Sequence, residues 1–185
     1  MKKYEMIYAD PPWRYRSGKV QGAAINHYAT MSDEELYQLP VAEIAADNCV
    51  LLLWATFPKL PEALRLIEAW GFQYKTVGFV WVKTNPSGNG FFSALAGGHA
   101  VMLRYVWLAV RGKPKRQCAG ISQLIISPRE RHSKKPDVVR NLAVTLVGDV
   151  PRIELFARET STGWDVWGNE VDCMHYADAI GRRCA

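Results

Sequence analysis

The sequence predicts an α/β fold with a mostly parallel sheet and helices on both of its faces. Apolar runs of strand length alternate with helical segments along the chain, as in sheets built from crossover units. The run at 48–56 is apolar at nearly every position, as expected of a strand that is buried on both faces. The chain has 185 residues, 49% hydrophobic and 22% charged, which is an ordinary globular composition. We therefore expect residues 1–185 to form a single domain.

The expected elements follow one another without an internal repeat or a linker. They are a strand at 4–9, a helix at 32–39, a strand at 48–56, a helix at 59–71, strands at 74–83, 104–112 and 123–128, a helix at 135–148 and a strand at 152–158. Ser32 is the expected N-cap of the first helix, and Glu35 completes its capping box. Pro61 suits the first turn of the second helix, and Gly71 ends that helix.

Polar side chains follow several of the expected strands. Ligands of an open α/β sheet bind beyond the carboxyl ends of its strands, where such side chains meet along one edge. The side chains concerned are Asp10, Lys83, Ser127 with Arg129, and Arg158, and Trp54 lies near another such end. The connections 14–31, 84–103 and 112–122 are long, which is typical of functional or mobile loops.

The segment Asp10-Pro11-Pro12-Trp13, directly after the first strand, carries the strongest chemical signal. Proline lacks an N–H and has a fixed φ, so the two prolines form a stiff corner whose carbonyl groups can accept hydrogen bonds. The ionised Asp10 carboxylate also only accepts, and Trp13 offers an aromatic face. Such a set is complementary to a planar ring bearing an amino group, and a flipped adenine is such a ring. The structural alternative is a rigid turn with Trp13 in the core.

The same groups would make the adenine amine reactive. Its lone pair is delocalised into the ring, so the amine is a poor nucleophile. Acceptors at Asp10 and the Pro11 carbonyl would hold both amino protons and favour the pyramidal nitrogen that attack requires. These interactions strengthen as positive charge develops, so they stabilise the transition state more than the ground state. A methyl sulfonium held in line would be the electrophile, and no strong base is required.

The charge balance is compatible with a polyanionic partner. The chain has 23 Lys and Arg against 18 Asp and Glu, a net charge of +5, with dense basic stretches at 111–116 and 129–135. No apolar run reaches the length of a membrane span and the N-terminus does not resemble a signal peptide, so we expect a cytoplasmic protein. The four cysteines form no Cys-x-x-Cys pair, and we expect no metal.

The sequence resembles the DPPW-type adenine-N6 methyltransferases, relatives of the catalytic subunit of the mRNA adenosine methyltransferase. DPPW after an apolar strand is the first shared block. The others are HYATMSDEEL at 27–36, LLLWAT at 51–56, VWVKTN at 80–85, LAVRGKP at 108–114, HSKKPD at 132–137, IELFAR at 153–158 and WDVWGNE at 164–170. They occur in family order over nearly the whole chain. The compact size and the run VGDVPRIELFAR are most similar to bacterial or prophage members, which are taken to act on DNA.

The resemblance implies a Rossmann-like methyltransferase fold, S-adenosylmethionine as the cofactor and N6 of adenine as the methyl acceptor. The expected catalytic residues are Asp10, Pro11, Pro12 and Trp13. The expected cofactor-binding residues are Asp10, Lys135, Arg158, Asn169 and Glu170, and the expected substrate-binding residues are Tyr28, Trp54 and Lys83. The fixed charge of Arg158 suits the carboxylate of the cofactor. The alternative for Lys135 and Arg158 is a solvated surface charge.

Two features depart from the family pattern. Family members often carry an upstream strand that touches the cofactor's adenine, whereas nine residues precede Asp10 here. We therefore expect cofactor contacts from the C-terminal half, and the strength of cofactor binding stays open. Ahead of LAVRGKP the family usually has an arginine and, four residues later, a glutamate. Here Ala100 and Arg104 stand at those positions, which inverts the charge near the expected target base. The glycine-rich segment 87–98 is either a loop that closes over nucleic acid or an ordinary surface loop.

Two other functions stay open at this stage. One is a non-catalytic, nucleic-acid-binding relative that needs a partner subunit, although the intact DPPW segment argues against it. The other is the same methylation on RNA, because the residues themselves do not separate DNA from RNA. The small size also makes a homodimer or a partner subunit a reasonable expectation.

Overall fold

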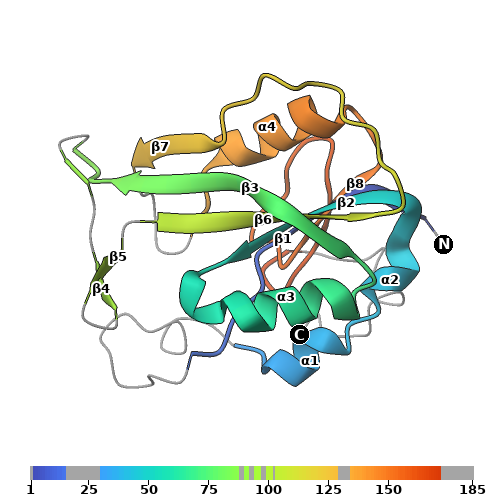
Figure 1. The fold of residues 1–185 in the computed structure, drawn as a ribbon, viewed down its shortest axis with the longest axis horizontal. Coiled ribbons are helices and arrows are strands. Elements are labelled where there is room, and N and C mark those ends of the chain that lie inside the picture. Colours follow the sequence, from blue (N-terminus) through green and yellow to red (C-terminus); the bar gives the residue numbers. More distant parts are fainter. Residues whose placement is uncertain are drawn as a thin grey trace.

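The computed structural model of the chain describes residues 2–15, 30–87, 90–91, 94–96, 99–101, 103–128 and 134–171, and the strands between 94 and 101 by their backbone alone. In chain order its elements are β1 (Tyr4–Ala9), α1 (Asp33–Tyr37), α2 (Val41–Ile44), β2 (Ala45–Ala55), the 3₁₀ turn η2 (Phe57–Lys59), α3 (Leu60–Ala69), β3 (Gln73–Thr84), β4 (Ala94–Ala96), β5 (His99–Val101), β6 (Leu103–Arg111), β7 (Leu124–Pro128), α4 (Asp137–Val147), β8 (Arg152–Leu155) and β9 (Asp165–Trp167). Figure 1 shows a central sheet between two layers of helices.

The central sheet has seven strands in the order β7-β3-β6-β2-β1-β8-β9. Neighbouring strands pair in parallel except at β6, which is antiparallel to both β2 and β3. The other strands of this sheet therefore point the same way, and the predicted mostly parallel α/β fold is confirmed.

The orientation of β6 decides where its flanking loops lie. Because β6 is antiparallel, its last residue and the connection 112–122 start at the amino edge of the sheet. There the Lys113 N–H donates to the Asn48 side chain, 2.7 Å away, near the start of β2. The connection 112–122 therefore lies at the opposite edge of the sheet from Asp10, which follows β1. The start of β6, with Arg104, lies instead at the carboxyl edge.

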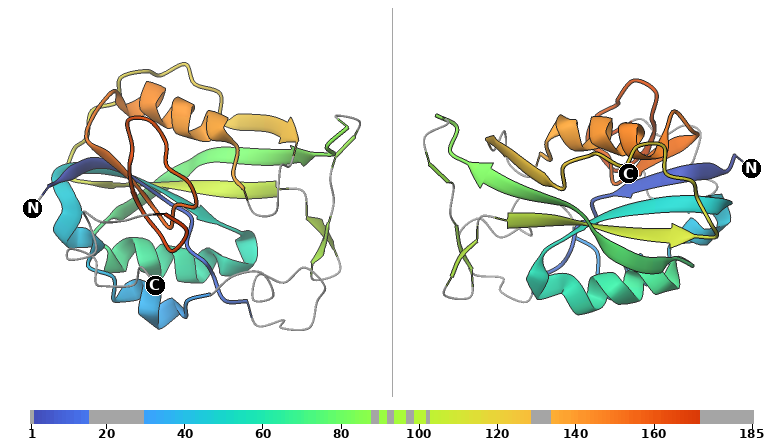
Figure 2. Two further views of the ribbon diagram at one scale, coloured as in Figure 1. Left: turned by 180° about the vertical axis from the view of Figure 1, so that it is seen from behind. Right: turned by 45° about the horizontal axis from the view of Figure 1, so that its top comes forward.

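Apolar side chains hold the helices on the sheet. The helices α1, α2 and α3 cover one face and α4 covers the other (Figures 1 and 2). Along β2, Leu51 and Leu53 belong to the core under α3, whereas Leu52 and Trp54 belong to the core under α4. This is the two-residue alternation of a strand that is buried on both faces. Burial of each such side chain contributes about 1.5–3 kcal/mol.

Local sequence signals set several element boundaries. The Ser32 hydroxyl accepts from the Glu35 N–H at 3.2 Å, and the Glu35 carboxylate accepts from the Ser32 N–H at 2.8 Å, which confirms the capping box of α1. Gly71 follows α3 with φ of +80°, a conformation in which glycine is not strained. The prediction missed α2, β4, β5 and β9, whose three or four residues are too few to give a periodic signal.

Two of the long connections lie only partly within the described residues. Of the connection 14–31, residues 16–29 are outside them, and Tyr28 with them. In the connection 84–103, β4 and β5 form a two-stranded antiparallel sheet. Figure 1 places this small sheet beyond the carboxyl end of β3. No helix of the described residues is both long and apolar enough to cross a membrane.

Candidate active site

The Asp10-Pro11-Pro12-Trp13 corner follows the last residue of β1. The Pro11 carbonyl accepts from the Trp13 N–H at 2.8 Å, and the Pro12 carbonyl accepts from the Met31 N–H at 3.0 Å. The Pro12 carbonyl is therefore engaged by the chain on the far side of the 14–31 connection. The Pro11 carbonyl keeps its second lone pair for another donor. Together with the fixed φ of proline, these bonds hold the corner rigid.

Trp13 does not offer a stacking face in this structure. Its side chain is 4% exposed and belongs to the core on the α3 face of the sheet. Its indole N–H donates to the Trp54 carbonyl at 3.0 Å, and the Lys59 ammonium lies 5.8 Å from the ring centroid. The expected aromatic face is thus turned into the core, as the structural alternative had it. In this conformation Trp13 anchors the corner to the end of β2.

Trp54 lies under the site rather than beside it. It is 1% exposed, and its indole N–H donates to the Tyr8 hydroxyl at 2.6 Å. Its ring makes an edge-to-face contact with Trp81, with ring centroids 6.3 Å apart. A direct contact of Trp54 with substrate would require these side chains to move. The expected substrate role of Trp54 is therefore not supported by the geometry.

Lys135 contacts the Asp10 carboxylate. It directly precedes Pro136, which is the N-cap of α4. Its ammonium forms an ion pair and a hydrogen bond with Asp10 Oδ2, and it lies 5.5 Å from the centroid of the Trp54 ring. Burial lowers the pKa of the Lys135 ammonium from its ordinary value, and Asp10 opposes that shift. The neighbouring cations Arg104 and Arg158 lower the pKa of Lys135 as well. The ammonium thus sits in a positively charged surrounding, with Asp10 as its counter-ion.

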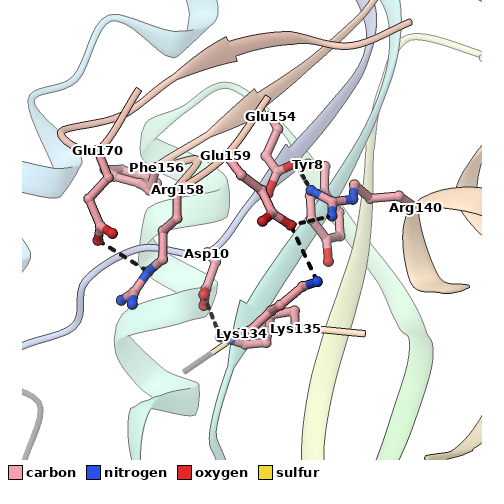
Figure 3. Close-up of a pocket in the computed structure, with 10 residues that line it drawn as sticks. All are labelled: Tyr8, Asp10, Lys134, Lys135, Arg140, Glu154, Phe156, Arg158, Glu159 and Glu170. Carbon is pink, nitrogen blue, oxygen red and sulfur yellow. Dashed lines mark hydrogen bonds and ion pairs between the residues drawn. The ribbon is translucent and has the colours of Figure 1, made fainter. Parts of the chain in front are cut away.

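Arg158 and Glu170 form an ion pair at one side of the pocket (Figure 3). The Arg158 Nε lies 3.6 Å from the Glu170 Oε1. Both come from chain that follows the last strands, β8 and β9. Two residues before Arg158, Phe156 has φ of +63°, which is uncommon for a bulky residue. This conformation turns the chain sharply after β8. Asn169, the residue before Glu170, is exposed.

A second group of charges forms the floor of the pocket. The Arg140 guanidinium of α4 pairs with Glu154 of β8 at 2.7 Å and with Glu159 at 3.4 Å. Arg140 and Glu154 are nearly buried. Burial raises the pKa of the Glu154 carboxyl above its ordinary value, and Arg140 opposes this. The Lys134 ammonium joins the group at 3.5 Å from Glu159.

These side chains surround a pocket of about 160 Å³ beyond the carboxyl ends of β1 and β8. Its lining residues are Tyr8, Asp10, Lys134, Lys135, Arg140, Glu154, Phe156, Arg158, Glu159 and Glu170. The structure therefore brings together four of the predicted site residues: Asp10, Lys135, Arg158 and Glu170. The other predicted residues that the structure describes are not part of the lining: Pro11, Pro12, Trp13, Trp54, Lys83 and Asn169. Tyr28 lies outside the described residues.

Five charged or hydroxyl-bearing lining residues were not predicted. They are Tyr8, Lys134, Arg140, Glu154 and Glu159. One signal was available, since Glu154 is a carboxylate inside the otherwise apolar segment Ile153–Leu155, and a charge inside a buried strand needs a partner. The partner Arg140 could not be read from the sequence, because it depends on where α4 crosses the sheet.

Lys83 lies on the same face of the sheet as Trp81, away from the pocket. Its ammonium is 4.9 Å from the Trp81 ring centroid. On the neighbouring strand, Arg104 pairs in register with Trp81. Both cations therefore belong to the carboxyl edge but not to the pocket lining.

The described residues show no group of three or more His, Cys, Asp or Glu that could hold a metal ion. Cys49 is buried and Cys118 half-buried, and both are free thiols. Burial raises the pKa of the Cys49 thiol to about 12, so it is not a nucleophile at neutral pH. The other two cysteines, Cys173 and Cys184, lie outside the described residues.

Comparison with known proteins identifies the kind of protein that carries this pocket. A family profile described as MT-A70 matches residues 4–170. The chain is 35% identical to a type II methyltransferase, M.MunI, from a Mycoplasma species, over 92% of this chain and 78% of that protein. It is 31% identical to human METTL4, described as an N(6)-adenine-specific methyltransferase, over 96% of this chain but 39% of that protein. It is 26% identical to an N6-methyladenosine RNA methyltransferase, MTA1, of Cryphonectria parasitica, over 91% of this chain and 52% of that protein.

Proposed function

Since the chain belongs to the MT-A70 methyltransferase family, we propose that it transfers a methyl group from S-adenosylmethionine to N6 of adenine in DNA. The observation that carries this proposal is the Asp10–Pro11 corner. It holds a carboxylate and a carbonyl with a remaining lone pair at the carboxyl edge of the sheet, and Asp10 lines the pocket. A carboxylate and a carbonyl on adjacent residues supply two acceptors, the number that the two protons of an exocyclic amine require.

Lys135 has a positioning role in this account. Its ammonium holds Asp10 Oδ2. A carboxylate offers about four acceptor sites on two oxygens, so Oδ1 stays available for one amino proton while the Pro11 carbonyl takes the other. Both interactions strengthen as the amine becomes positively charged, which accelerates the transfer without a strong base. The excess proton leaves after transfer.

The chemistry of the pocket fits the amino-acid end of the cofactor. That end carries an ammonium and a carboxylate, and the lining offers the carboxylate of Glu159 beside the cations Arg158 and Lys135. A volume of about 160 Å³ is smaller than a whole ligand site of this kind. The cofactor, when bound, supplies an electrophilic methyl group on its sulfonium. Asn169 and Glu170, at the rim, are the groups that we assign to the ribose hydroxyls.

The choice of DNA rests on the resemblance to bacterial members and on the similarity to M.MunI. The fungal MTA1 proteins, whose description names RNA, make RNA the alternative acceptor. We further propose that residues 1–185 act as one domain in the cytoplasm, as a homodimer or with a partner subunit.

A non-catalytic nucleic-acid-binding role is the second candidate. It is favoured by Arg104, which stands where the family usually has a glutamate, close enough to Lys135 to lower its pKa. It predicts binding of nucleic acid without a calorimetric signal for S-adenosylmethionine.

The test is transfer of labelled methyl groups from S-adenosylmethionine to unmethylated DNA and, separately, to RNA. The products are digested to nucleosides and separated. Labelled N6-methyldeoxyadenosine is the expected product. Label in N6-methyladenosine alone would move the acceptor to RNA. No label on either polymer, from folded protein, would overturn the enzymatic proposal and leave the non-catalytic one.

A further inference from the structure

Three cations line the carboxyl edge of the sheet on its α4 face, and we call Lys83, Arg104 and Lys135 the cationic strip. Arg104 pairs in register with Trp81. The Lys83 ammonium lies 4.9 Å from the Trp81 ring, and the Lys135 ammonium lies 5.5 Å from the Trp54 ring. The two indoles touch edge to face, so the strip has a continuous aromatic backing. The edge is the one at which the arrowheads of β3 and β7 end in Figure 1.

The guanidinium of Arg104 adds a positive charge close enough to the Lys135 ammonium to lower its pKa. Asp10 pairs with Lys135 at one end. The Arg104 guanidinium donates to the carbonyl of the adjacent Leu103 at 3.1 Å, and within the described part of the chain it forms no ion pair. Like charges close together raise the free energy of the site, and an anion between them would offset this. The fork of an arginine matches a phosphate particularly well.

Resting on the proposed function, we propose that Lys83 and Arg104 bind the phosphodiester backbone next to the target adenine. The polynucleotide then crosses the ends of β3 and β6 on its way to Asp10. Such contacts set the register of the strand and are independent of base sequence.

The dense basic stretch at 111–116 does not lie where it could hold a polynucleotide against the pocket. Residues 111–116 begin at the amino edge of the sheet, because β6 is antiparallel, and Lys115 is exposed there. A strand bound at that edge would not reach the pocket. Lys115 is therefore a control of equal charge on the opposite edge.

The experiment measures binding of a short fluorescein-labelled duplex DNA, and of a single-stranded RNA of the same sequence, by anisotropy at several NaCl concentrations. Each phosphate contact contributes about 0.7–0.9 to the slope of log K against log salt. We expect Arg104→Ala and Lys83→Ala each to reduce the slope by about 1 and the double variant by about 2. Lys115→Ala should leave the slope unchanged, and Arg104→Lys should retain it because the charge is kept.

The outcomes separate this inference from the proposed function, because binding needs neither cofactor nor turnover. A reduced slope in Arg104→Ala, with wild-type protein that transfers no methyl group, would support the strip and reject the enzyme. An unchanged slope in Arg104→Ala and Lys83→Ala would overturn the strip even for an active enzyme. A loss in Arg104→Lys as large as in Arg104→Ala would also overturn it, since the effect would then be structural.

Discussion

At the residue scale, the site depends on a few charges whose surroundings shift their pKa values. Lys135 is held in a position where its charged form is disfavoured, because burial and two arginines outweigh the attraction of Asp10. Functional sites often contain groups of this kind, which are kept for function at the expense of stability. The expectation of a role for Lys135 came from family resemblance, and the structure supplies the contact with Asp10.

The variant Lys135→Met separates stability from function. A lysine whose folded pKa is lowered destabilises the fold while it is charged, and this effect fades as pH rises from the folded pKa toward the unfolded value near 10.5. We expect the variant to melt at a higher temperature than wild type at neutral pH, because the burial that disfavours the charged lysine is then no longer a cost. Methyl transfer should fall by about 10²-fold.

Thermal unfolding at neutral and alkaline pH checks the sign of this effect. The difference between wild type and Lys135→Met should shrink as pH rises. A variant that melts lower than wild type at neutral pH would contradict the account of Lys135. Lys113→Met, at the amino edge, is the control and should change neither quantity.

The buried pair Arg140–Glu154 gives a second prediction at this scale. Arg140→Met leaves the Glu154 carboxylate nearly buried without its partner, which costs about 3–5 kcal/mol. The folded pKa of Glu154 is already raised above its ordinary value and would rise further, so the loss should grow as pH rises from the unfolded pKa near 4.5 toward the folded pKa. Adding Glu154→Gln should recover most of the stability.

Urea unfolding at about pH 5 and about pH 8 measures the Arg140 effect. The wild type, both single variants and the double variant complete the cycle. Equal destabilisation at the two pH values, or no recovery in the double variant, would show that the pair does not stabilise the fold in the way proposed.

At the element scale, close backbone approaches hold the end of β8 against the turn that follows β9. A Cβ on Gly168 would lie 2.7 Å from the Ala157 backbone nitrogen and closer still to its carbonyl oxygen. These atoms cannot move without shifting the neighbouring Arg158 and Asn169. The glycine thus sets the distance between the two rims of the pocket.

Gly168→Ala should therefore lower both stability and cofactor affinity. Overpacking against backbone costs about 1–3 kcal/mol, and the displaced rim should weaken S-adenosylmethionine binding severalfold by calorimetry. Gly120→Ala is the matched control, because a Cβ there meets nothing within 4 Å. Equal behaviour of the two variants would contradict the role given to Gly168.

Local sequence patterns predicted some of the helices and strands but not others. Apolar runs and the capping box of Ser32 identified the long strands and the helices α1, α3 and α4, because these signals are local. The direction of β6 was hidden, since a strand buried on both faces has the same apolar pattern whichever way it runs. The three residues of β9 were too short for any pattern.

At the scale of the whole molecule, the site arises where distant segments meet at one edge. Asp10 could be predicted because the chemistry of DPPW is local. Glu154 and Arg140 could not, because they come together only through the register of β8 on β1 and the path of α4. Trp13 and Trp54 were expected to meet substrate, yet their side chains complete the two cores.

The fold also determines at which edge of the sheet the basic residues lie. Because β6 is antiparallel, the basic stretch 111–116 begins at the amino edge, whereas Arg104 lies at the carboxyl edge. Lys83 and Lys135 lie at the carboxyl edge as well. Net charge alone would not distinguish these two ends. The account therefore predicts that only the carboxyl edge faces nucleic acid.

The most direct test of the central claim compares wild type, Asp10→Ala and Asp10→Asn in transfer of labelled methyl groups to adenine under single-turnover conditions. Far-UV circular dichroism and melting confirm that each variant is folded. The account predicts a loss of at least about 10²-fold in the transfer rate for both variants, because each lacks the charged acceptor that stabilises the transition state. Transfer by folded Asp10→Ala at the wild-type rate would show that the corner after β1 does not carry the reaction.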